Sequence, residues 1–231
     1  MPKRPAFYFS LRSPYSWFAY RELLDEHPDV AAAVTWRPFF EPDGRSEEAL
    51  RKAGGSFPYV AMSRAKHLYI LRDVGRLARE RGLSMTWPVD RDPVWEVPHL
   101  AYLAALREGR GPEFVAAAYR TRWEEGGDIC DRSVIARIAG ELDLDPVALA
   151  GAADDPELRE EGVRLLLDVC RDGVFGVPFF VNGASRYWGV DRLGRFVAEL
   201  RAAGGPGSSG PGDAPLPVGA GSDPGHAGGC G

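Results

Sequence analysis

The stretch covering residues 7–17 constrains this chain more than any other. Its first three residues, Phe-Tyr-Phe, are aromatic and have strand character, and a short polar turn follows them. Ser13 and Pro14 then have the pattern of a helix N-cap followed by proline at the first helical position. The sequence therefore predicts a strand that leads to a helix N-terminus, where free backbone N–H groups and the helix dipole favour a thiolate, carboxylate or phosphate.

The spacing Ser13-Pro14-Tyr15-Ser16 is that of a Cys-Pro-x-Cys motif with serine at both cysteine positions. In thioredoxin-like proteins that motif lies at the same strand-to-helix turn, where the helix lowers the pKa of the first cysteine. Without sulfur at these positions, the chain cannot itself exchange disulfides there. The same electrostatics can act on a thiol brought in from outside, and the alternative is that Ser13 is a helix cap only.

Length and composition limit the classes of protein that need to be considered. The 231 residues, of which 45% are hydrophobic, allow a large core in one domain or in one domain with an insert. The net charge of −5, without a basic block, argues against a nucleic-acid partner. The sequence contains neither a secretory signal pattern nor an apolar run of membrane-spanning length, so we expect a cytoplasmic protein without a membrane partner.

The cysteines do not suggest a structural framework. Cys130, Cys170 and Cys230 are far apart in the sequence, and Cys230 lies in a glycine-rich tail with His226. Such spacing predicts neither a set of disulfides nor a metal site.

The first part of the chain has the pattern of a parallel strand-helix-strand unit. Residues 6–9 and 33–40 are predicted strands, and residues 14–26 between them form a predicted helix that ends at His27-Pro28. A connection of this kind is expected to be right-handed. Pro38 indicates the end of a strand or an edge position.

Helical periodicity dominates residues 46–172, and the longest predicted helix covers 59–81. Strand character returns at 177–181, where Asn182-Gly183 predicts a hairpin to a partner strand over 185–188.

A last predicted helix over 191–201 completes the order β-α-β, helical segment, β-β-α. This order predicts an α/β fold, a thioredoxin-like sheet interrupted by a large all-α insertion. The predicted divisions are a first sheet part (1–44), a helical insertion (45–172), a second sheet part (173–202) and a tail (203–231). The tail is rich in Gly and Pro and has too few apolar residues to offset its ordering entropy, which predicts disorder.

Two separated segments match one family. Residues 9–17, with serine in place of cysteine, and residues 173–193, with a Gly-Val-Pro block, resemble the 2-hydroxychromene-2-carboxylate isomerases. These belong, with the kappa-class glutathione transferases, to the DsbA-like branch of thioredoxin folds. Residues 64–83 are similar to the long helix of the family's insertion, so the resemblance spans residues 6–202.

The resemblance implies a glutathione site. It implies a cis peptide bond between Val177 and Pro178, packed against the Ser13 turn, with the Val177 backbone pairing to the cysteinyl part of glutathione. Ser13 would hydrogen-bond the sulfur and favour its thiolate, and Asp191 would contact the γ-glutamyl amino group beside Val190. From the residues alone, Pro178 could also mark an edge strand, and Asp191 could be a helix cap.

Six residues are candidates for substrate binding: Arg12, Tyr15, Ser16, Ser56, Lys66 and Trp95. Arg12 and Lys66 could hold a carboxylate, and the aromatic residues could wall an aromatic ligand. The alternatives are a solvated helix face for Lys66 and core positions for the aromatic residues. Ser56 stands where the family has asparagine, which indicates a substrate different from 2-hydroxychromene-2-carboxylate.

The hypothesis from the sequence is an enzyme, a thiol-dependent isomerase of a small conjugated or aromatic compound. Its cofactor would be glutathione or another low-molecular-weight thiol. Thiolate addition would convert a double bond into a single bond, which rotates or allows ring opening before the thiol is eliminated. The alternatives are thiol conjugation, as in a glutathione transferase, and a DsbA-like binding or chaperone module without redox activity. The expected partner is the small-molecule substrate, and a homodimer is left open.

Overall fold

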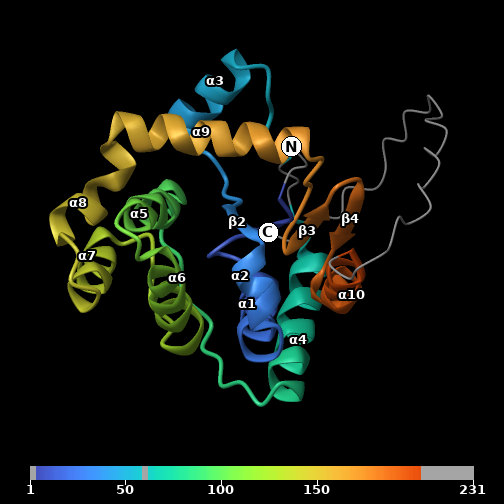
Figure 1. Cartoon of the computed structure of the whole chain (residues 1–231). Coiled ribbons are helices and arrows are strands. Elements are labelled where there is room, and N and C mark those ends of the chain that lie inside the picture. The colour runs from blue at the N-terminus through green and yellow to red at the C-terminus, as the bar shows by residue number, and fades with distance from the viewer. Residues whose placement is uncertain (1–3, 59–61, 204–231) are drawn as a thin grey trace.

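The fold is built on a four-stranded mixed sheet, seen in the computed structural model of Figure 1, which describes residues 4–58 and 62–203. Its strands, in spatial order, are β2 (Thr35–Pro38), β1 (Ala6–Phe9), β3 (Phe179–Asn182) and β4 (Ser185–Trp188). β1 pairs parallel with β2 and antiparallel with β3, and β3 and β4 form the predicted hairpin. Pro38 is the last residue of an edge strand, as predicted.

The two faces of the sheet are covered by different helices because side chains alternate along a strand. On one face, Phe7 stacks on Phe180 at 5.1 Å between ring centroids, and Phe180 stacks on Phe196 of α10 (Leu193–Ala203) at 5.0 Å. On the other face, Tyr8 belongs to a cluster with Val169 of α9 (Pro156–Arg171). The sheet is therefore a middle layer, and β1 is buried along its whole length.

Helices fill the chain between β2 and β3, which confirms the helical character predicted for this region. They are α3 (Gly44–Lys52), α4 (Arg64–Glu80), α5 (Glu96–Arg107), α6 (Gly111–Tyr119), the π-helical turn η1 (Arg120–Glu124), α7 (Arg132–Glu141), α8 (Pro146–Gly151), the 3₁₀ turn η2 (Ala152–Asp154) and α9. In Figure 1, α5 to α8 lie on one side of α1 (Pro14–Glu26), and α4 and α10 lie on the other. None of the helices in the described ranges is long and apolar enough to span a bilayer.

Several boundaries differ from the sequence prediction. Pro28 starts a further short helix, α2 (Pro28–Ala33), because proline fits the first position of a helix as well as it ends one. β2 consequently begins only at Thr35. The last helix begins at Leu193, after a 3₁₀ turn η3 (Val190–Arg192), so Asp191 precedes the helix.

Some predictions lie outside the described residues. They are residues 59–61 of the predicted helix over 59–81, the disordered tail from residue 204 onward, and the positions of His226 and Cys230 in that tail. Within the described residues this helix begins only at Arg64, with Ser63 as its N-cap, so its predicted start was too early.

Candidate functional site

The turn between β1 and α1 has the geometry that the sequence predicts. Ser13 is the N-cap of α1, and its Oγ accepts a hydrogen bond from the backbone N–H of Ser16 at 3.2 Å. Pro14 follows at the first helical position. The Ser13 N–H donates to the carbonyl oxygen of Ser10 at 3.1 Å, which closes the turn.

Side chains from α1 and from the insertion hold this turn in place. The Ser10 N–H donates to Ser16 Oγ at 3.2 Å, and Tyr119 Oη donates to the Ser10 carbonyl oxygen at 3.1 Å. The Leu11 N–H donates to Nε2 of His99 at 3.1 Å. All of these groups are buried, so the position of Ser13 is fixed by α5 and α6 as well as by its own helix.

His99 is neutral in this arrangement. Nδ1 lies 2.7 Å from the Trp95 carbonyl oxygen and must donate to it, which leaves Nε2 as the acceptor for Leu11. Burial lowers the pKa of His99 to about 3, although the bond to Trp95 acts in the opposite direction. The sequence analysis did not select His99, because a single histidine within an apolar helix gives no signal of what it contacts.

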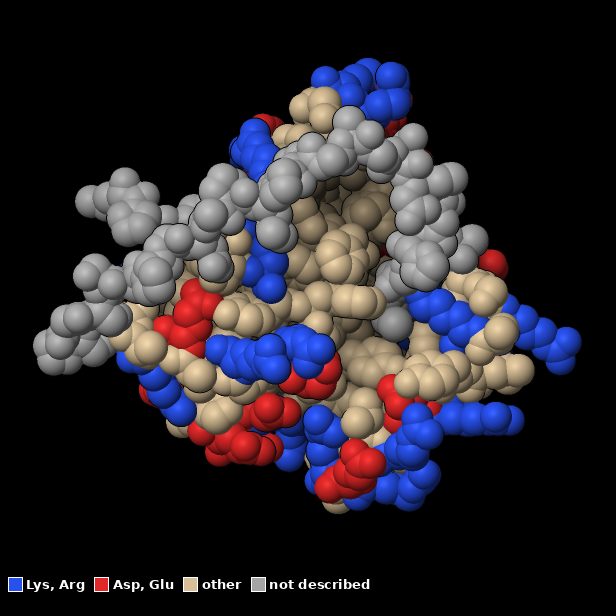
Figure 2. Space-filling view, turned by 90° about the vertical axis from the view of Figure 1, so that its right-hand side faces the viewer, with Lys and Arg blue, Asp and Glu red and all other residues tan. Residues whose placement is uncertain are grey.

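A cavity of about 450 Å³ lies next to this turn. Its walls come from α1, α4, the segment before β3 and the connection from β4 to α10: Tyr15, Tyr69, Asp73, Leu77, Val177, Pro178, Trp188, Gly189, Val190, Asp191 and Arg192. We call it the α1–α4 cavity. The side of the molecule that carries α4 and α10 faces the viewer in Figure 2, where a hollowed, mostly uncharged region lies above clusters of charged side chains.

The peptide bond between Val177 and Pro178 is cis. The Pro178 carbonyl oxygen accepts a hydrogen bond from the Gly189 N–H at 3.0 Å, which links this bend to the segment that carries Asp191. Val177 is buried, and in the described part of the chain no hydrogen bond engages its backbone N–H or C=O.

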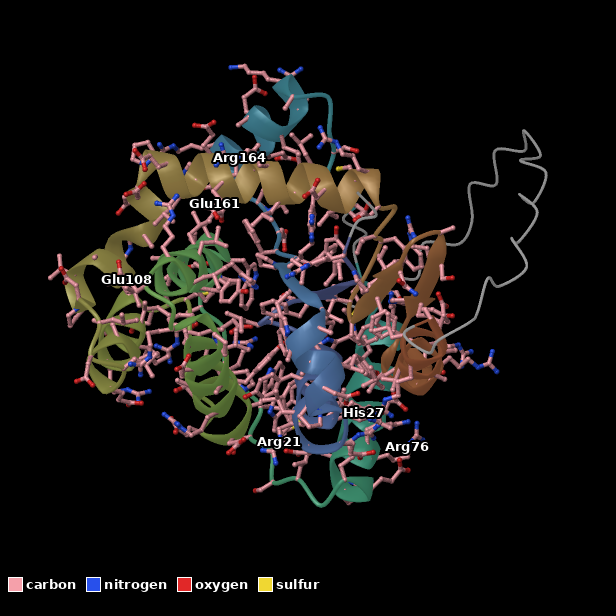
Figure 3. All side chains as sticks on the ribbon, in the orientation of Figure 1. Arg21, His27, Arg76, Glu108, Glu161 and Arg164 are labelled. Carbon is pink, nitrogen blue, oxygen red and sulfur yellow. The ribbon has the colours of Figure 1, made fainter. Side chains whose placement is uncertain are left out.

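One wall of the α1–α4 cavity is an ordered polar cluster. Tyr15 Oη donates to Asp73 Oδ2 at 2.8 Å, and Arg76 contacts Asp73 Oδ1 at 2.7 Å. Burial raises the pKa of Asp73, but the hydrogen bonds from Arg76 and Tyr15 outweigh it and hold this pKa below its usual value. Figure 3 shows Arg76 projecting from α4. The cluster therefore joins α1 to α4 through an ionised carboxylate.

Five of the residues selected from the sequence meet at the α1–α4 cavity: Tyr15, Val177, Pro178, Val190 and Asp191. The Asp191 side chain is 68% exposed and pairs with Arg192 at 2.9 Å.

Ser13 directly precedes the first turn of α1 but is only 1% exposed, and it is not one of the lining residues. Its hydroxyl oxygen accepts from Ser16, while its own proton has no acceptor among the described residues.

The remaining candidates for substrate binding lie elsewhere. Arg12 pairs with Glu41 at 3.0 Å, and its guanidinium lies 5.3 Å from the centre of the buried Trp95 ring. Arg122, which the sequence analysis did not select, lies 5.0 Å from the same ring and makes two bonds to Asp90 at 2.7 and 2.9 Å. Trp95 therefore takes part in two cation–π contacts.

Ser16, Ser56 and Lys66 also do not line the α1–α4 cavity. Ser16 is fully buried, and its hydroxyl is engaged in the turn. Ser56 is exposed, and its carbonyl oxygen accepts from the Cys170 thiol at 3.1 Å. Lys66 is half-buried in the first turn of α4.

The strand order, the helix that starts at the end of β1, the cis proline before β3 and the all-helical insertion define a thioredoxin-like protein of the DsbA type. The family model of the DsbA-like thioredoxin domain matches residues 6–201, and the chain belongs to this family. The predicted fold class and the predicted DsbA-like thioredoxin family are thereby confirmed.

Solved structures agree at the level of the fold. A 2-hydroxychromene-2-carboxylate isomerase superposes with a TM-score of 0.68 and 22% identity, covering 86% of this chain and 95% of that one. A probable DsbA oxidoreductase from Streptomyces coelicolor has a TM-score of 0.62 and 20% identity, over 95% and 97% of the two chains. The cytosolic disulfide reductase DsbM from Pseudomonas aeruginosa, solved with GSH, has a TM-score of 0.57 and 18% identity, over 86% and 98%. The search of curated proteins found no match.

Proposed function

We propose that this protein is a thiol-dependent isomerase of a small conjugated or aromatic compound, with glutathione or another low-molecular-weight thiol as its cofactor. The observation that carries the proposal is the α1–α4 cavity, which joins the first turn of α1 to the Val177–Pro178 bend and to Asp191. Because serine occupies positions 13 and 16, the turn itself carries no thiol, and a second molecule would supply the reactive one. Such a cofactor is consistent with the reducing environment of the cytoplasm.

The polar groups around the cavity fit a γ-glutamyl-cysteinyl peptide. The Ser13 hydroxyl has a proton left to donate to a sulfur atom, and the Val177 backbone has an N–H and a C=O left to pair with the cysteinyl unit. The exposed carboxylate of Asp191 can receive an amino group. Two structures of the same fold support this assignment, one of a 2-hydroxychromene-2-carboxylate isomerase and one of a disulfide reductase solved with GSH.

A bound thiol would supply a sulfur nucleophile that forms one C–S bond to an electron-poor double bond and leaves again with the same electron pair, so that the substrate is isomerised without net oxidation. Ser13 and the N-terminus of α1 would stabilise the negative charge on that sulfur. A thiol with a pKa of about 8.5 is only a few per cent ionised at neutral pH, and each unit of decrease corresponds to ~1.4 kcal/mol. Since Ser13 is 1% exposed, neighbouring side chains must shift before sulfur can reach its hydroxyl.

For the substrate, the aromatic rings of Tyr15, Tyr69 and Trp188 offer flat apolar walls. Arg12 and Lys66, as partners of a substrate carboxylate, and Ser16, Ser56 and Trp95 remain predictions that do not rest on this cavity.

The test is the ionisation of bound glutathione, followed by thiolate absorbance against pH. We expect the pKa of the bound thiol to lie about one to two units below its free value and to return toward that value in Ser13→Ala. Ser63→Ala is the matched control, because Ser63 Oγ caps α4 by accepting the Lys66 N–H at the same distance of 3.2 Å. Equal thiol pKa values in the native protein and in Ser13→Ala would contradict the proposal.

Thiol conjugation is distinguished from isomerisation by the mass of the product. An isomer keeps the mass of the substrate, whereas a conjugate gains the mass of the thiol. A mixture of copurifying small molecules, incubated with and without glutathione and followed by mass spectrometry, gives this comparison.

The burial of Ser13 favours a second candidate, a binding module without thiol chemistry. This candidate predicts that peptides bind equally well with and without glutathione and that Ser13→Ala leaves their affinity unchanged. Peptide binding that requires no thiol, together with no glutathione binding, would favour the module over the enzyme.

A further inference from the structure

A second cavity of about 450 Å³ lies on the other side of α1. Its walls come from α1, α2, β2, α5 and α6, and its largest side chains are Tyr20, Leu24, Trp36, Tyr102, Leu106 and Val115. We call it the α1–α5 cavity. In Figure 1, α5 and α6 lie opposite α4 and α10 across α1, so the two cavities are separated by this helix. Its volume is within the range of about 300–1,000 Å³ that is usual for small-molecule sites.

Two tyrosine hydroxyls at this cavity make no hydrogen bond within the described part of the chain. Tyr102 is 3% exposed and Tyr20 is 8% exposed, and both side chains line the cavity. No hydrogen bond among the described residues engages either hydroxyl, and burial raises the pKa of both. The nearby Trp36 differs, because its indole N–H donates to the Ala31 carbonyl oxygen at 2.9 Å. Neither hydroxyl oxygen is among the fully enclosed polar atoms that lack a partner, so solvent reaches both of them. On an otherwise apolar wall, these two donors can be satisfied by an acceptor on a ligand in place of water.

The walls of the α1–α5 cavity carry no charged side chain. Figure 3 labels Arg21 within α1, His27 after α1 and Glu108 after α5, and none of these three lines the cavity. Arg21 is paired with Asp25 at 3.3 Å. An ion placed in this cavity would lose hydration without gaining a counter-charge.

We propose that the α1–α5 cavity binds a neutral small molecule with an apolar, ring-sized body and a carbonyl or ether oxygen that accepts hydrogen bonds from Tyr102 and Tyr20. The raised pKa values keep both phenols protonated, so that they act as donors. Trp36 and the aliphatic side chains cover the apolar body of the ligand. This inference does not depend on the proposed thiol chemistry, since none of its residues belongs to the α1–α4 cavity.

The experiment uses the full chain and the neutral fluorescent naphthyl ketone prodan, whose emission depends on hydrogen bonding to its carbonyl group. We expect saturable binding to the native protein. Tyr102→Phe and Tyr20→Phe keep the rings and remove one donor each, and each is expected to raise the Kd of the probe by about 5- to 10-fold and to shift its emission to shorter wavelength. Ala32→Trp places a large side chain at an exposed position of the wall and is expected to abolish binding.

Tyr69→Phe is the matched control, because Tyr69 lines the α1–α4 cavity instead. It should leave the Kd unchanged, and a Kd that rises in Tyr69→Phe but not in Tyr102→Phe would place the probe in the other cavity and overturn the proposal. Absence of saturable binding would also overturn it. Light scattering gives a further test. If the native protein is a dimer and Ala32→Trp is a monomer, a second copy of the chain covers this face, and the proposal is wrong.

Discussion

At the scale of single residues, His99 is the least obvious determinant of the site. Its Nε2 is the acceptor for the Leu11 N–H, two residues before Ser13, inside a fully buried environment. His99→Leu fills similar space but leaves that N–H unpaired, so we expect unfolding free energy to fall by ~1–3 kcal/mol in denaturant titrations. His99→Gln offers an amide oxygen and should recover part of the loss. Equal stability of His99→Leu and the native protein would show that the bond contributes nothing.

The pKa of His99 also predicts a pH dependence of stability. In the folded protein this pKa is about 3, whereas an unfolded histidine titrates near its ordinary value. The unfolded chain therefore binds the proton more readily, and stability falls as pH decreases from about 6.5 toward 3, by up to ~1.4 kcal/mol per pH unit from this group. The decline between pH 6 and pH 4, measured by denaturant unfolding, should be shallower in His99→Gln. An unchanged slope would contradict the assignment.

At the scale of elements, the connection from β4 to α10 controls where Asp191 lies. Gly189 has φ of 102°, and a Cβ there would approach Asp191 Oδ1 to 2.7 Å. Gly189→Ala is therefore expected to displace the carboxylate and to weaken glutathione binding by about tenfold, measured by calorimetry.

Gly183→Ala is the control for this prediction. Gly183 also has positive φ, 55°, but a Cβ there meets nothing within 4 Å. Both substitutions should cost ~1 kcal/mol of stability from backbone strain, and only Gly189→Ala should change the affinity for glutathione. Equal affinities in the two variants would mean that Asp191 does not contact the thiol cofactor.

At the scale of the whole molecule, the sequence predicted elements well where local chemistry defines them. Ser13 with Pro14 starts α1, Asn182-Gly183 makes the hairpin, and Pro38 ends an edge strand. Pro28 was misassigned because a proline after a helix is equally able to begin the next one. The contacts of His99 could not be predicted, because they join residues 88 positions apart and depend on how α5 packs against the turn.

The candidate site was also predicted best where a sequence motif defines its residues. Tyr15, Val177, Pro178, Val190 and Asp191 were selected through motifs, and the fold brings them to one cavity. The candidates selected for their charge, Arg12 and Lys66, do not line this cavity, because charge does not specify which way a side chain faces.

The central claim is that the Ser13 hydroxyl, at the N-terminus of α1, donates a hydrogen bond to the sulfur of a thiol that a second molecule supplies. A crystal structure of the protein soaked with glutathione tests it most directly. The account predicts the glutathione sulfur within hydrogen-bond distance of Ser13 Oγ, with the cysteinyl unit paired to the Val177 backbone. Glutathione bound with its sulfur away from Ser13, or a Ser13 hydroxyl still enclosed at saturating glutathione, would contradict it.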